Sequence, residues 1–170
     1  MDVVNLKGFP IRLKDDLPAE GIQAEDFYFV KGDLNEDSLF DHHEKAKLLV
    51  SVPSMDTGIG VLIAKKVNEY LKKREGVFAL LISKDLPFAI KRVFDNEKIS
   101  DLQIASDFRY GDYGDDYGVE MLEGALRGLL ANSVVLLNEK NKIVYSELVS
   151  DIFAEPDYES VFEEVDELLK

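Results

Sequence analysis

The sequence predicts an α/β fold in a single domain over residues 1–170, with a mixed central sheet covered by helices on both faces. Two observations lead to this prediction. Continuous apolar runs of strand length alternate with longer segments whose apolar residues recur at helical spacing, which is the order of βαβ units. Towards the end, two apolar segments flank a short polar stretch and predict a hairpin, and a final helical segment follows.

The first third of the chain predicts four strands. Residues 3–6 and 11–14 alternate and flank Lys7-Gly8-Phe9-Pro10, so they predict an N-terminal hairpin. Residues 27–31 predict a further strand. The apolar run 48–52 ends at a proline and predicts a strand that is buried on both faces.

The middle of the chain predicts two helices and two strands. Residues 58–74 predict a helix whose last turn is basic, near the negative end of the helix dipole. Residues 77–83 predict a second buried strand, and Pro87 opens a short helix that ends at about residue 94. Residues 102–105 predict a weaker strand.

The last third predicts a second hairpin and a C-terminal helix. The hairpin strands are residues 134–137 and 143–149. The helix covers residues 158–169, follows Pro156 and Asp157, and places its apolar side chains on one face. Together the elements fit a thioredoxin-like three-layer sandwich.

Composition and charge exclude several classes of function. The formal net charge is -14, from 20 basic and 34 acidic residues, and this sign repels nucleic acid and anionic membrane surfaces. No apolar run is long enough to span a bilayer and no secretory signal is visible, so we expect a cytoplasmic protein. Cysteine is absent, which excludes disulfides, thiolate metal sites and thiol nucleophiles.

The segment 53–60, Pro-Ser-Met-Asp-Thr-Gly-Ile-Gly, has the form of an active-site loop between a buried strand and a helix. We expect Asp56 and Thr57 to shape the turn and cap the helix, and Met55 to fill a gap in apolar packing. Asp56-Thr57-Gly58 also spells the active-site triplet of aspartic proteases. That triplet belongs in an all-β barrel, whereas here it opens a helix in an α/β pattern.

No metal site or cofactor is predicted. Adjacent residues such as His42 and His43 rarely converge on one ion, and residues 41–47 read as an exposed linker. The acidic residues of 112–116 lack the spacing of a calcium loop and are expected to be solvated. The three tyrosines of residues 110–117 would form with them an amphipathic surface suited to a protein contact. Lys84 is expected at the surface.

Four segments, in this order, resemble the bacterial thiol peroxidases, the atypical two-cysteine branch of the peroxiredoxins. They are residues 52–58, 83–89, 117–119 and 155–159. The resemblance covers essentially the whole chain. It implies a thioredoxin-like (peroxiredoxin) fold and, for the family, an antioxidant oxidoreductase that reduces hydroperoxides with thioredoxin.

The resemblance also implies which positions carry the family's chemistry. A peroxidatic cysteine lies in the first turn of the helix, a resolving cysteine lies on the next helix, and an arginine stabilises the thiolate and the developing oxyanion. In this sequence Pro53 and Thr57 match the pattern. Gly60 stands at the peroxidatic position, Phe94 at the resolving position and Asn132 at the arginine position.

These replacements predict a catalytically inactive binding, interaction or regulatory relative. Glycine cannot attack an O–O bond, and asparagine supplies no charge. The alternative is that the chain is a thiol peroxidase after all, as overall family similarity suggests. The replacements could be natural or introduced by mutation. Glycine instead of serine or alanine, together with the loss of the arginine, favours natural divergence.

Two kinds of partner are expected. The resemblance implies a homodimer that pairs through the face around the loop, with Met55 and residues 110–117 as candidate interface. Loss of a cysteine and an arginine predicts a space for a small polar ligand or a partner's side chain. The residues expected to line that space are Pro53, Thr57, Gly60 and Asn132.

Overall fold

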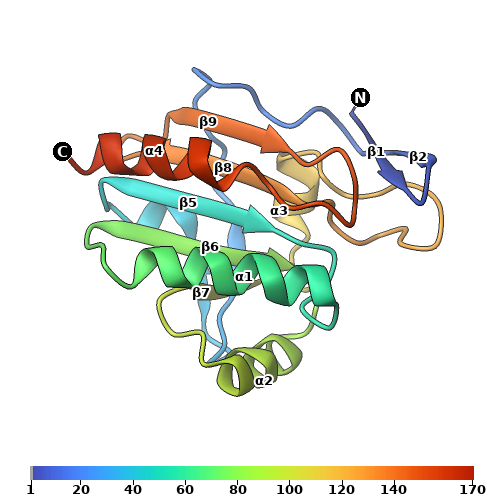
Figure 1. The fold of residues 1–170 in the computed structure, drawn as a ribbon, viewed down its shortest axis with the longest axis horizontal. Coiled ribbons are helices and arrows are strands. Elements are labelled where there is room, and N and C mark those ends of the chain that lie inside the picture. The colour runs from blue at the N-terminus through green and yellow to red at the C-terminus, as the bar shows by residue number, and fades with distance from the viewer. Residues whose placement is uncertain (1) are drawn as a thin grey trace.

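Seven strands form one mixed sheet, in the order β4-β3-β7-β6-β5-β8-β9 (Figure 1). The computed structural model describes residues 2–170. The strands are β3 (Tyr28–Val30), β4 (Glu36–Ser38), β5 (Ala46–Ser51), β6 (Val77–Ser83), β7 (Gln103–Ser106), β8 (Ser133–Asn138) and β9 (Ile143–Leu148). A separate antiparallel hairpin consists of β1 (Val3–Leu6) and β2 (Phe9–Arg12). The predicted mixed sheet and N-terminal hairpin are therefore confirmed.

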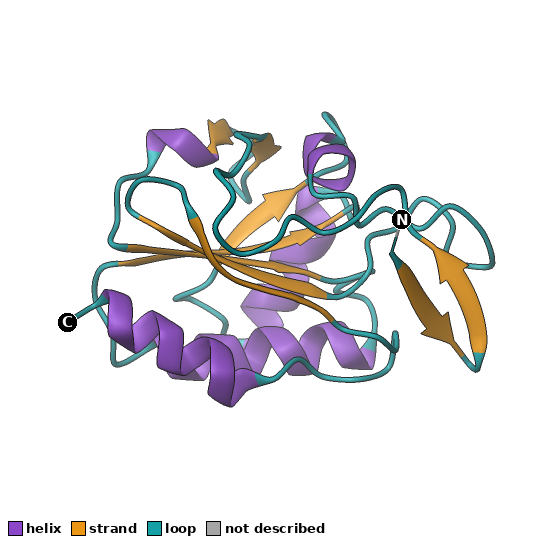
Figure 2. Ribbon diagram, turned by 90° about the horizontal axis from the view of Figure 1, so that it is seen from above, coloured by secondary structure: helices purple, strands orange, loops and turns teal. Residues whose placement is uncertain are grey.

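Helices cover both faces of the sheet. They are α1 (Gly58–Leu71), α2 (Pro87–Glu97), α3 (Asp112–Asp116) and α4 (Tyr158–Leu168). α1 and α4 lie on one face and the short α3 lies on the other (Figures 1 and 2). One hydrophobic cluster contains Ile63 of α1, Phe94 of α2 and Val165 of α4, and a second cluster contains Tyr113 of α3.

The centre of the sheet positions the loops that matter for function. β5 pairs in parallel with β6 and antiparallel with β8, and all its residues are buried. β6 pairs in parallel with β7. Because parallel strands end at the same edge of a sheet, the loops that follow β5, β6 and β7 meet there.

The N-terminal hairpin turns earlier than the sequence predicts. Lys7 and Gly8 have positive φ angles of 51° and 83°, and Phe9 already pairs with Leu6. A two-residue turn with two left-handed residues matches the natural twist of paired strands. Phe9 and Pro10 therefore belong to β2 and not to the turn.

The sequence also misses β4 and α3. Both are too short for an apolar period to show, and both consist mainly of polar residues. α2 runs on to Glu97 and ends where Lys98 adopts the left-handed conformation, with φ 57°. No helix within residues 2–170 is long and apolar enough to cross a membrane.

Candidate functional site

The loop between β5 and α1 is closed by its own side chains. Thr57 is the N-cap of α1, and its Oγ1 accepts a hydrogen bond from the Gly60 amide at 3.1 Å. The same hydroxyl donates to the Ser54 carbonyl at 2.8 Å. The predicted capping role is therefore confirmed for Thr57, whose side chain satisfies one of the free amides of the helix start.

A carboxylate from the neighbouring loop holds this loop in place. Asp85 follows β6, and its two oxygens accept hydrogen bonds from Ser54 Oγ at 2.8 Å and from the Met55 amide at 2.7 Å. Ser83 donates to the same carboxylate at 2.8 Å. The sequence holds a usable signal for this contact, because Ser54 and Asp85 each follow a predicted buried strand, and adjacent parallel strands bring such loops together. Met55 is buried in the cluster with α1, as predicted.

Gly60 lies in the first turn of α1, at the position that the resemblance assigns to the peroxidatic cysteine. A Cβ built on Gly60 would lie 2.2 Å from the Ser54 carbonyl oxygen and 3.1 Å from Thr57 Oγ1. The obstacle is backbone, and the contacts of Asp85 hold that backbone. A side chain at Gly60 therefore requires the loop to move, and the space expected there does not exist.

Asn132, at the position assigned to the arginine, directly precedes β8 and is buried. Its Nδ2 donates to the Ile152 carbonyl at 2.9 Å. Its Oδ1 has no hydrogen-bond partner within residues 2–170. The side chain therefore ties β8 to the segment after β9.

Phe94, at the position assigned to the resolving cysteine, lies on the buried face of α2. It belongs to the hydrophobic cluster that also contains Ile63 of α1 and Leu81 of β6. A phenyl ring in this place contributes to the core through its large apolar area. Phe94 is therefore part of the packing between α2 and the sheet.

A cavity of about 310 Å³ opens beside the first turn of α1. Its lining residues are Leu6, Lys7, Pro53, Thr57, Ile59, Ala125, Leu126, Ile152 and Phe153. All of them except Lys7 and Thr57 are apolar. A cavity at Pro53 and Thr57 thus exists as expected, but its lining includes neither Gly60 nor Asn132, and it is apolar where a polar space was predicted.

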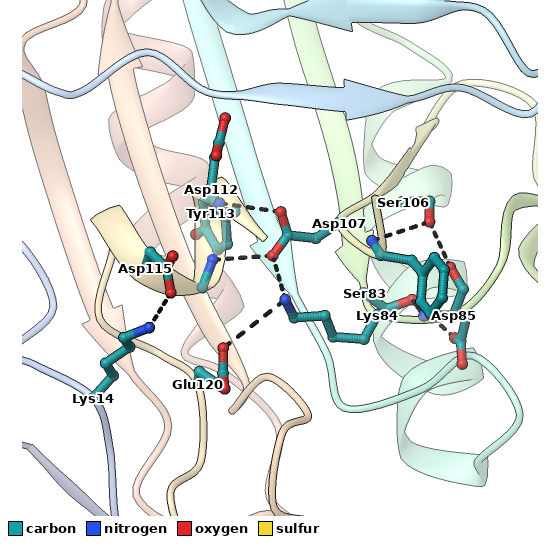
Figure 3. Close-up of polar contacts among 12 residues, drawn as sticks. Lys14, Ser83, Lys84, Asp85, Ser106, Asp107, Asp112, Tyr113, Asp115 and Glu120 are labelled. Atoms are coloured by element: carbon teal, nitrogen blue, oxygen red, sulfur yellow. Dashed lines mark hydrogen bonds and ion pairs between the residues drawn. The ribbon is translucent and has the colours of Figure 1, made fainter. Parts of the chain in front are cut away.

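The prediction of Lys84 at the surface holds only in part, because its side chain is 17% exposed. Figure 3 shows its ammonium group between two carboxylates, with Nζ 3.3 Å from Asp107 Oδ2 and 3.9 Å from Glu120 Oε2. Asp107 is completely buried and accepts hydrogen bonds from the amides of Tyr113 and Gly114 in α3. Burial raises the pKa of Asp107, and the charge of Lys84 opposes that rise. The ion pair connects the loop after β6 to the loop after β7.

Residues 110–117 do not form the predicted amphipathic surface. Tyr113 and Tyr117 are 0% exposed and stack with 4.4 Å between ring centroids, and Phe27 packs edge-on against both rings. Of the three tyrosines, only Tyr110 reaches the surface. Met55 is buried as well, so within the predicted interface of Met55 and residues 110–117 only Tyr110, Asp115 and Asp116 are exposed.

Residues 41–47 are an exposed linker only in part, because Asp41, His43 and Lys45 are exposed and the other residues are not. The His42 ring stacks on Phe78 with 3.6 Å between ring centroids, and its Nε2 lies 2.8 Å from Asp37 Oδ2. Ala46 and Lys47 already belong to β5 and are buried. Within residues 2–170, no group of three or more histidine, aspartate or glutamate side chains is arranged to hold a metal ion.

Comparison with known proteins agrees with the fold and the sequence motifs. The Redoxin family profile matches residues 19–162. A thiol peroxidase of Aquifex aeolicus is 39% identical over 166 residues, which are 98% of each chain. A thiol peroxidase of Helicobacter pylori is 37% identical over 161 residues, which are 95% of this chain and 97% of that one.

Solved structures show the same architecture. A peroxiredoxin-like protein from Aquifex aeolicus superposes with a TM-score of 0.93 at 38% identity, over 98% of this chain and 96% of that one. A thiol peroxidase from Chromobacterium violaceum superposes with a TM-score of 0.89 at 21% identity, over 97% of this chain and 95% of that one. The chain is therefore a thioredoxin-like α/β protein with the peroxiredoxin fold. It belongs to the Redoxin family, among the relatives of bacterial thiol peroxidases.

Proposed function

We propose that this chain is a catalytically inactive relative of the thiol peroxidases, which binds a ligand beside α1 instead of reducing hydroperoxides. One observation carries the proposal. At Gly60 the sequence offers no thiol, and the Ser54 carbonyl lies 2.2 Å from where a side chain would begin. This position therefore offers neither a nucleophile nor room for one.

The chemistry of the family explains why this loss is decisive. Thiol-dependent reduction of a hydroperoxide requires a thiolate that attacks the O–O bond and becomes a sulfenic acid while the alkoxide leaves and takes up a proton. No residue of this chain can form a thiolate. The Thr57 hydroxyl donates to a backbone carbonyl, which is not a general base. The Asn132 amide is neutral and is already bonded to the Ile152 carbonyl.

The alternative function is a working thiol peroxidase, and the names of the sequence relatives speak for it. Those names describe proteins related to this chain over nearly its whole length. The absence of cysteine from this chain favours an inactive protein, because activity without cysteine would require another nucleophile.

A coupled assay tests the proposal. The purified protein is mixed with cumene hydroperoxide, thioredoxin, thioredoxin reductase and NADPH, and NADPH oxidation is followed by absorbance. We expect NADPH to be oxidised no faster than in a control reaction that lacks the protein. NADPH oxidation that rises in proportion to the amount of protein would overturn the proposal.

We also propose a homodimer, through a different surface from the one the sequence suggested. Four exposed side chains, from the start of α2 and from loops near it, form a patch, called here the α2 patch: Leu34, Leu86, Phe88 and Phe108. They line a hollow of about 410 Å³. Phe88 and Phe108 are each 65% exposed, which is unusual for large apolar side chains.

The size and the rim of the α2 patch suit a second copy of the chain. The four side chains of the patch expose roughly 450 Å² of apolar surface, from their exposed fractions and about 200 Å² for a fully exposed large side chain. A stable interface buries about 800 Å² on each partner. At the rim, Arg109 pairs with Glu36 at 2.7 Å, so both signs of charge are present, as a surface that meets its own copy requires.

Sedimentation velocity tests the dimer. We expect the unmodified chain to associate, and Phe88→Ser or Phe108→Ser to shift the equilibrium to monomer. Phe9→Ser is the control, because Phe9 is 72% exposed but lies on the N-terminal hairpin, away from α2 (Figure 1). A chain that stays monomeric at every concentration would contradict this part of the proposal.

A further inference from the structure

We infer that the cavity beside α1 is a binding site for an alkyl carboxylate, such as a free medium-chain fatty acid. This inference rests on the proposed function, because it names the ligand class of the same non-catalytic cavity. Two independent features lead to it, namely the apolar lining and a cation at the rim.

The lining of the cavity selects an alkyl chain. Four separate stretches of the chain contribute apolar groups, among them Ile59 of α1, Leu126 and Ile152. Phe153 also lines the cavity and is 59% exposed, so a large apolar ring stands uncovered at this place. A ligand that covers such surface gains about 25 cal/mol for each Å² removed from water. The volume of about 310 Å³ lies at the small end of the range for ligand pockets.

A small polar ligand fits this cavity poorly. Thr57 is one of the two polar residues in the lining, and its hydroxyl already donates to the Ser54 carbonyl and accepts from the Gly60 amide. Asn132 does not reach the cavity and is bonded to the Ile152 carbonyl. A polar solute would therefore lose its water without gaining matching hydrogen bonds, which is unfavourable.

Lys7 supplies the recognition of the acidic head group. It lies in the turn of the N-terminal hairpin and lines the cavity. Its side chain makes no ion pair within residues 2–170, although the chain carries a net charge of -14. The cavity also lies at the start of α1, where the helix dipole favours negative charge. An unpaired cation at the mouth of an apolar cavity matches a carboxylate on an alkyl chain.

Calorimetric titration with sodium octanoate at low ionic strength tests the site, with 1-octanol as the neutral probe. We expect saturable binding of octanoate to the unmodified chain. In Lys7→Glu the affinity should be about fivefold lower, which corresponds to the loss of one exposed ion pair. The affinity for 1-octanol should not change in that variant. Lys73→Glu is the matched control, since it alters the net charge equally at the exposed far end of α1. It should leave octanoate binding as it is.

A second variant tests the cavity itself. Ala125 is exposed and lines the cavity, so Ala125→Phe should fill it without disturbing the core, and circular dichroism verifies the fold. We expect this variant to lose both probes. Absence of saturable binding to the unmodified chain, or binding that Ala125→Phe leaves intact, would overturn the inference. Equal loss in Lys7→Glu and Lys73→Glu would overturn the role of Lys7. These outcomes are separate from NADPH oxidation in the peroxidase assay, which tests the proposed function.

Discussion

At Gly60, the surrounding backbone limits which side chains can be accommodated. The Ser54 carbonyl lies where a side chain of residue 60 would begin, and it accepts a hydrogen bond from the Thr57 hydroxyl. Asp85 then fixes the same loop through the Ser54 hydroxyl and the Met55 amide. A side chain at Gly60 must therefore break or stretch these hydrogen bonds, whatever its chemistry.

Two alanine variants in the same helix turn measure this constraint. We expect Gly60→Ala to lower the free energy of unfolding by about 1–3 kcal/mol, as overpacking does in other proteins. Gly58→Ala is the matched control: nothing lies within 4 Å of its Cβ, so it should be neutral or stabilising by up to about 1 kcal/mol. Urea denaturation gives both values. Equal stabilities of the two variants would show that the loop yields freely.

Restoring the family's residues extends this argument to activity. The variant Gly60→Cys, Phe94→Cys, Asn132→Arg carries all three groups that the resemblance assigns to catalysis. We expect it to be less stable than the unmodified chain and inactive, because the loop leaves no room for the new thiol and the other two positions serve packing. Stopped-flow measurement of its reaction with hydrogen peroxide checks this. A fast reaction would mean that the loop rearranges at little cost.

At the scale of elements, the first turn of α1 depends on its cap. Thr57→Ala removes the acceptor for the Gly60 amide and the donor to the Ser54 carbonyl. We expect a loss of about 0.5–2 kcal/mol in the free energy of unfolding, and much of it should return in Thr57→Ser, which keeps the hydroxyl. Urea denaturation of both variants checks this. No difference between alanine and serine would contradict the capping role.

The C-terminal end of α1 and the helix α4 make a contact whose contribution to stability depends on pH. Tyr70 and Phe162 stack with 3.8 Å between ring centroids, and Arg74 lies over the Tyr70 ring and binds Asp166 at 2.8 Å. The hydrogen bonds from Arg74 and then Tyr70 lower the pKa of Asp166. A carboxyl group with a lower pKa in the folded state stabilises the fold above its unfolded pKa of about 3.9, and loses that effect as the pH falls further.

The lowered pKa of Asp166 predicts a pH-dependent difference in stability between the unmodified chain and a variant without this carboxyl group. We expect Asp166→Asn to melt at a lower temperature than the unmodified chain near neutral pH. The gap should narrow as the pH falls below about 4 and close below the lowered pKa of folded Asp166, where the unmodified carboxyl group is protonated in both states. Thermal melts followed by circular dichroism at several pH values check this. A gap of constant size would mean that the charge of Asp166 does not matter.

The elements that the sequence predicts correctly are those with long apolar patterns. The strand at residues 77–83 is predicted with its observed bounds, since its apolar side chains fill both faces of a covered sheet. The five-residue α3 is missed because its apolar residues are too few to show a period. The hairpin turn is misplaced because Phe9 and Pro10 look like turn residues, whereas Lys7 and Gly8 adopt the left-handed angles.

At the scale of the molecule, some residues at the edge where β5, β6 and β7 end lie where the sequence predicts, and others do not. Pro53 and Thr57 border a cavity, as expected. Gly60 does not, because a missing side chain suggests space and the folded backbone fills it. The partial burial of Lys84 involves an ion pair with Asp107, a distant residue in sequence, so no local pattern predicts it.

Two further statements about the whole molecule stay predictions from the sequence, namely the cytoplasmic location and the single domain over residues 1–170. The family assignment does not depend on either, since it rests on the profile match and on the relatives.

The central claim is that this chain holds a molecule beside α1 and does not reduce hydroperoxides. The most direct measurement counts hydroperoxide molecules consumed per protein chain, with thioredoxin in excess and with the three methionines followed by mass spectrometry. We predict that consumption stops at the few equivalents that methionine oxidation accounts for. Consumption that continues through many equivalents per chain, with the methionines intact, would contradict the account.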